Sequence, residues 1–119
     1  MTGGSEVPAA HRVALSFDVD ALSLWIGSFK ATNTSMVSRG EFDVPATRRI
    51  LAMLQRFDLK ATFFVPGHTA LAFPDLALDI ASRGHEIGHH GFVHERTTEL
   101  SPEREREVSV AGWRSSRGC

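Results

Sequence analysis

The sequence predicts an α/β fold, in which a small parallel sheet is joined by helices. Three short apolar segments rich in strand-forming residues lie at 13–17, 59–65 and 85–88. A helical pattern follows each of them, so strand and helix alternate three times along the chain. Alternation at this spacing is typical of parallel strands connected by crossover helices.

The chain is short and nearly neutral. Its 119 residues, 42% of them hydrophobic, fit one domain and leave no room for two. A net charge of -1 argues against nucleic acid or an anionic membrane surface as the main partner. The apolar runs are far shorter than the roughly 20 residues that a membrane span needs, so no membrane segment is predicted.

The termini and the cysteine content bear on location. Cys119 is the single cysteine, which excludes an internal disulfide and a zinc site built from several cysteines. Residues 1–6 lack the basic start and the apolar stretch of a secretory signal, so we expect a cytoplasmic protein. Residues 1–10 are expected to form a flexible leader.

Each predicted helix has its own start signal. Pro45 opens the first helix, in which apolar residues recur at helical spacing. The second begins near Pro74 and stops at Gly84. Ser101 is a serine N-cap followed by Pro102 at the first position of the third helix.

The connection over residues 21–44, between the first strand and the first helix, is long enough to be a functional loop. Trp25 in this segment is a candidate pocket residue, although packing in an aromatic core is the commoner role for such a side chain. His68 follows the second strand at the same edge of the sheet and is a second candidate for the pocket.

Two carboxylates stand where the first strand ends. Asp18 and Asp20 are two residues apart, and in an extended chain such residues point to the same side. The carboxyl ends of parallel strands are where α/β folds place catalytic groups. The alternative is structural: one carboxylate caps the next segment and the other is solvated.

Histidines gather after the third strand, with four of the six in the chain between His85 and His94. His90 and His94 form an H-x-x-x-H pair, whose spacing brings two imidazoles together on one turn. With a carboxylate from a neighbouring strand, this pair would suit zinc or another divalent first-row metal. A polar surface loop is the alternative, and His85 and His89 are expected to pack or to face elsewhere.

Three segments in this order resemble the polysaccharide deacetylases, the NodB homology domain or carbohydrate esterase family 4. Residues 16–20 (S-F-D-V-D) resemble the first family motif, usually T-F-D-D-G, and residues 84–95 (G-H-E-I-G-H-H-G-F-V-H-E) resemble the second. Residues 61–65 (A-T-F-F-V) match the strand between them. The D-V-D form is similar to a cytoplasmic bacterial subgroup related to peptidoglycan deacetylases.

The resemblance implies an irregular (β/α) barrel, of which about three β-α units are present. It implies that Asp18 is the general base and that Asp20, His90 and His94 bind a divalent metal, usually Zn²⁺. The implied reaction is N-deacetylation of an N-acetylated glycan such as peptidoglycan or a chitin-like polymer, or of a small amide. A ring-opening amidohydrolase of the allantoinase type is the alternative within the superfamily.

The resemblance also divides the chain. Residues 11–107 correspond to the N-terminal part of the family domain, and the later family motifs are not visible after Glu107. Residues 108–119 show no period and are expected to be an irregular tail, left by truncation or a frameshift. We therefore expect little activity from this chain by itself, and a third alternative is an inactive metal-binding fragment. A homo-oligomer is an open expectation for the full-length protein.

Overall fold

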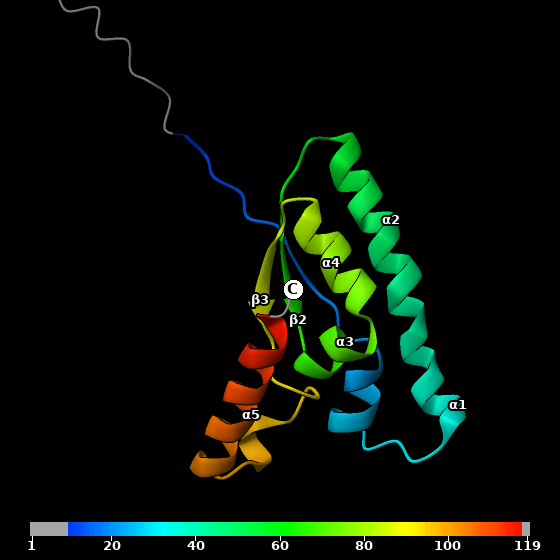
Figure 1. Cartoon of the computed structure of the whole chain (residues 1–119), viewed down its shortest axis with the longest axis vertical. Coiled ribbons are helices and arrows are strands. Elements are labelled where there is room, and N and C mark those ends of the chain that lie inside the picture. Colours follow the sequence, from blue (N-terminus) through cyan, green and yellow to red (C-terminus); the bar gives the residue numbers. More distant parts are fainter. Residues whose placement is uncertain (1–9, 118–119) are drawn as a thin grey trace, which may run out of the picture.

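The computed structural model describes residues 10–117 and contains a three-stranded parallel sheet (Figure 1). The strands are β1 (Ser16–Asp18), β2 (Thr62–Val65) and β3 (Glu86–His89), in the order β1-β2-β3. Both neighbouring pairs are parallel. The predicted fold class and strand adjacency are thus confirmed, although the first two strands are shorter than the apolar segments that predicted them.

Helices connect and cover the strands (Figure 1). Helices α2 (Asp43–Arg56) and α4 (Pro74–Ser82) pack on each other, and α4 also contacts β3. Helix α5 (Pro102–Ser116) lies against α3 (Gly67–Ala72) and β3. Among residues 10–117, no helix has the length and apolar character to cross a membrane. A further short α-helix, α1 (Thr34–Val37), precedes α2 in the chain.

The core lies between the middle strand and helices α2 and α4. Phe63 of β2 is fully buried and stacks on Phe17 of β1 with ring centroids 5.3 Å apart. Leu51 from α2 and Ile80 from α4 are also fully buried beside it. Loss of a buried aromatic side chain of this kind typically costs about 3–5 kcal/mol of stability. This packing fixes the strand ends, and therefore the residues that follow them.

The connection over residues 21–44 is not the single loop that its composition predicts. It contains a π-helix (Leu24–Ser28), the short helix α1 and a 3₁₀ helix (Ser38–Phe42). Such short turns bury too few residues to leave a periodic apolar pattern. Asn33, whose side chain accepts a hydrogen bond from Met36 N, is the local cap that starts α1.

The prediction of an irregular segment from residue 108 is wrong up to Ser116, where α5 ends. The buried face of α5 includes Val108 and Gly112. A side chain at Gly112 would collide with Gly91 O, so glycine is what allows the close approach. Because the contact uses a glycine, the face has no apolar period to detect. Most of the predicted leader, residues 1–9, lies outside the described residues.

Candidate metal centre

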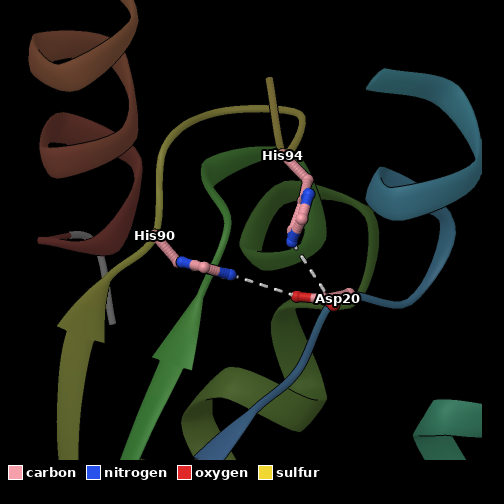
Figure 2. A group of neighbouring side chains, drawn as sticks. All are labelled: Asp20, His90 and His94. Carbon is pink, nitrogen blue, oxygen red and sulfur yellow. Dashed lines mark ion pairs between the residues drawn. The ribbon is translucent and has the colours of Figure 1, made fainter. Parts of the chain in front are cut away.

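The first and third strands deliver polar side chains to one edge of the sheet. Asp18 is the last residue of β1, with Asp20 two residues beyond it, and His90 directly follows β3. The parallel ladder continues past β1, because Val19 N donates to Phe64 O at 2.9 Å. Figure 2 shows His90 and His94 pointing toward Asp20 from the loop that follows β3.

The structure brings the three predicted metal ligands together. His90 Nε2 lies 3.4 Å from Asp20 Oδ1, and His94 Nε2 lies 3.6 Å from Asp20 Oδ2. One ligand atom from each residue lies within 4.8 Å of the other two. Asp18 Oδ2 is 3.9 Å from His90 Nε2, at the rim of the same cluster.

The chemistry of the cluster fits a divalent cation. Asp20 Oδ1 and His90 Nε2 are buried and have no hydrogen-bond partner. Buried polar atoms are nearly always paired, because leaving one unpaired costs about 1–3 kcal/mol. A carboxylate oxygen and two imidazole nitrogens aimed at one point form a donor set typical of zinc and similar first-row metals.

The raised pKa of Asp20 also fits a cation site. Burial raises the pKa of Asp20 above its ordinary value, and the nearby His94 and His90 offset part of that rise. The carboxyls of Asp18 and Asp43 raise it further. The surrounding protein therefore does not fully compensate an ionised Asp20, and a bound cation would do so.

Buried hydroxyl groups hold the Asp20 backbone in place. Thr69 Oγ1 donates to Asp20 O at 2.8 Å, and Ser23 Oγ lies 2.8 Å from the same Thr69 oxygen. The next residue, Ala21, has a φ of 48° and donates its N–H to Asp43 Oδ2 at 2.8 Å. These contacts tie the chain after β1 to the starts of α2 and α3, so the ligand position is set by buried structure.

The loop that carries the histidines is held from both sides. Glu95 accepts hydrogen bonds from Phe92 N and Val93 N, both at 3.1 Å, and so closes the turn between the two histidines. From α3, His68 N donates to Phe92 O at 2.8 Å. Sequence reasoning did not single out Glu95, although its place directly after H-x-x-x-H was an available signal.

A cavity of about 260 Å³ opens beside the cluster. Neither Trp25 nor His68 lines this cavity, so their pocket role stays a prediction. Trp25 packs on Phe29, with ring centroids 5.3 Å apart, and Arg39 lies 5.7 Å from the Trp25 ring. The lining residues are His89, His90, Gly91, His94, Glu95, Thr97, Leu100, Glu105, Val108 and Ser109.

Parallel strands with helical crossovers and an Asp-His-His cluster at their carboxyl ends define an α/β protein with a candidate metal centre. Comparison with protein families gives the narrower assignment. The model of the polysaccharide deacetylase family matches residues 7–109, and the chain belongs to this family.

Individual relatives agree with the family assignment. The chain is 34% identical over 101 residues to a peptidoglycan deacetylase of Helicobacter pylori, covering 81% of this chain and 33% of the relative. It is 34% identical to a Mycobacterium smegmatis protein of known structure that is named for this family, with a TM-score of 0.80 over 88% of this chain and 38% of that one. The chain therefore spans about a third of the length of these relatives.

A third relative separates fold from activity. A carbohydrate esterase family 4 pseudoenzyme from Bacillus anthracis superposes with a TM-score of 0.68 at 22% identity, over 93% of this chain and 32% of that one. This likeness concerns the fold alone. The same fold thus occurs in a protein that is named a pseudoenzyme.

Proposed function

We propose that this chain carries the metal-binding and base-bearing part of a deacetylase that hydrolyses the carbon–nitrogen bond of N-acetyl groups. The observation that carries the proposal is the convergence of Asp20, His90 and His94, with Asp18 beside them. The names of the family and of the Helicobacter relative support the reaction class.

Exposure separates the roles of the two aspartates. The Asp20 side chain is 18% exposed and faces both histidines, as a ligand would, whereas the Asp18 side chain is 58% exposed. Asp18 can therefore reach solvent and substrate while it stays at the rim of the cluster. We assign Asp20, His90 and His94 as metal ligands and Asp18 as the general base.

The metal supplies Lewis acidity when it is bound, lowering the pKa of water and polarising a carbonyl group. Zn²⁺ is the ion we propose, because two histidines and one carboxylate form a donor set found in catalytic zinc sites. Asp18 accepts the proton of the attacking water as the oxygen bonds to the acetyl carbon. As the carbon–nitrogen bond breaks, the leaving nitrogen takes up the proton that Asp18 accepted from the water, and the products are acetate and an amine.

The substrate class is an N-acetylated glycan, such as peptidoglycan or a chitin-like polymer. The Helicobacter relative is named for peptidoglycan, which favours this class over the ring-opening alternative. The cytoplasmic location and the homo-oligomer expected from the sequence stay predictions. Cell fractionation and sedimentation are their respective tests.

Calorimetric titration with zinc tests the metal assignment directly. One ion should bind to each chain, and Asp20→Asn should weaken that binding at least about 100-fold. A wild-type chain that binds no divalent metal would overturn the proposal. His11→Ala is a suitable control, because His11 is exposed and lies outside the cluster.

Acetate release tests the reaction. The chain spans about a third of the Helicobacter relative, so the sharper assay uses a chimera in which residues 10–109 replace the matching segment of that relative. Acetate should be released from N-acetylglucosamine oligomers in the presence of zinc. The 119-residue chain alone, which matches only about a third of that relative, should release acetate more slowly than the chimera.

A further inference from the structure

The π-helix Leu24–Ser28 touches the histidine loop in a way that the proposed function does not yet use. Ser28 Oγ lies 2.7 Å from His94 Nδ1 and 2.6 Å from the carbonyl oxygen of the same residue. Ser28 and His94 are 66 positions apart in the sequence, and both are partly buried. One hydroxyl group thus contacts both the ring and the backbone of a residue in the cluster.

Counting protons fixes the direction of both hydrogen bonds. A serine hydroxyl has one proton to donate, and a carbonyl oxygen can only accept. The Ser28 proton therefore goes to His94 O, and His94 Nδ1 must donate its own proton to Ser28 Oγ. In the neutral ring this leaves Nε2 without a proton, with its lone pair facing Asp20 Oδ2 at 3.6 Å.

The backbone around Ser28 is shaped for this contact. A side chain at Gly27 would collide with Val93 O, so only glycine lets the helix approach the peptide before His94. The extra residue of the π-helical turn, closed by Phe29 N donating to Leu24 O at 3.1 Å, sets the position of Ser28. Single π-helical turns occur frequently at functional sites. His94 has a φ of 55°, and the Ser28 bond to its carbonyl supports that conformation.

We propose that Ser28 is a positioning residue that holds His94 as the Nδ1–H tautomer and so keeps its Nε2 free to bind the metal. This inference rests on the proposed function for its metal, but its tautomer assignment does not. Outer partners of metal-bound histidines fix ring orientation and tautomer, and losing one typically weakens metal binding by about 10–100-fold.

The first test reads the tautomer without metal. In proton–nitrogen correlation spectra of the metal-free chain, the neutral His94 ring should carry its proton on Nδ1. His94→Gln identifies the signal by its loss. A proton on Nε2 in the wild-type chain overturns the inference, and this measurement decides the matter even if a serine variant fails to fold.

The second test compares zinc affinity by competition with a chromogenic chelator. Ser28→Ala should weaken zinc binding by about 10–100-fold and shift His94 toward the Nε2–H tautomer. Ser82→Ala is the matched control, because Ser82 Oγ also donates to a backbone carbonyl, Asp79 O, but lies in α4. Ser82→Ala should change neither the zinc affinity nor the tautomer of His94.

The outcomes separate the two proposals. A wild-type chain that binds zinc as tightly as Ser28→Ala overturns the role of Ser28 and leaves the metal centre standing. A wild-type chain that binds no zinc overturns the metal centre, while the tautomer of His94 still tests the Ser28 contact by itself.

Discussion

Two histidines at opposite ends of β3, His85 and His90, differ in whether their buried ring nitrogens have hydrogen-bond partners. His85, just before the strand, is 7% exposed, and its Nδ1 accepts the Ala61 N–H at 3.2 Å. Its ring packs edge-on against Phe63 at 5.2 Å. His90, just after the strand, has a buried Nε2 with no hydrogen-bond partner.

The contrast lies in how polar atoms are satisfied. At His85 a buried nitrogen and a buried N–H pair within the protein, so the residue contributes to stability. At His90 a buried nitrogen and the Asp20 oxygen lie 3.4 Å apart and neither has a hydrogen-bond partner, which is unfavourable unless a cation binds between them. The unpaired buried atoms therefore lie at the proposed functional end of the strand, and the paired ones lie at its structural end.

The largest expected effect is on catalysis at the functional end. Asp18→Asn removes the proton acceptor and should lower acetate release by about 10²–10⁴-fold in the chimera. Zinc affinity should stay close to wild type, because the exposed Asp18 side chain stands at the rim of the cluster. Equal rates for the variant and the wild type would show that another group is the base.

The next largest effect is on metal binding. Asp20→Asn keeps the shape of the side chain but removes its charge, so zinc should bind at least about 100-fold more weakly, beyond the usual loss for an outer partner. Chelator competition measures the change, with His11→Ala as the control. Unchanged affinity would mean that the Asp20 carboxylate is not a ligand, and the comparison with His85 would lose its basis.

A smaller effect, on stability alone, is expected at the structural end. His85→Leu leaves the Ala61 N–H buried without a partner, which should lower the free energy of unfolding by about 1–3 kcal/mol in urea titrations. His85→Asn retains an acceptor and should lose less. Zinc affinity should not change in either variant, and a loss of affinity would show that the two ends are coupled.

The smallest effect is the pH dependence that His85 adds to stability. Burial, then Lys60 and Arg83, lower the pKa of His85 in the folded chain. As the pH falls below about 6.5, the unfolded chain takes up this proton first, so stability declines until the lower folded pKa is passed. Above that range His85 is neutral in both states and contributes no slope.

Urea titrations across this pH range measure the slope. The wild-type chain should lose more stability on acidification than His85→Asn, since the variant has no imidazole at this position. If the free energy of unfolding changed with pH equally in the two proteins, the lowered pKa of His85 would be contradicted.

The sequence by itself determined the alternation of strand and helix and the positions of the polar side chains along each strand. Asp18 and Asp20 share a side because an extended chain repeats every two residues, and Ser101 caps α5 as its local pattern predicts. The H-x-x-x-H spacing marked His90 and His94. Such features depend on neighbours in the chain, so a sequence pattern is enough to find them.

Tertiary structure alone decided what these residues touch. The contact of Ser28 with His94 joins residues 66 positions apart, and Gly27 makes room for it by having no side chain. The buried face of α5 could not be predicted from the sequence, because one of its residues, Gly112, adds nothing to an apolar pattern. Local backbone periods determine which way a side chain points, whereas contacts across the fold depend on where distant segments come to rest against the core.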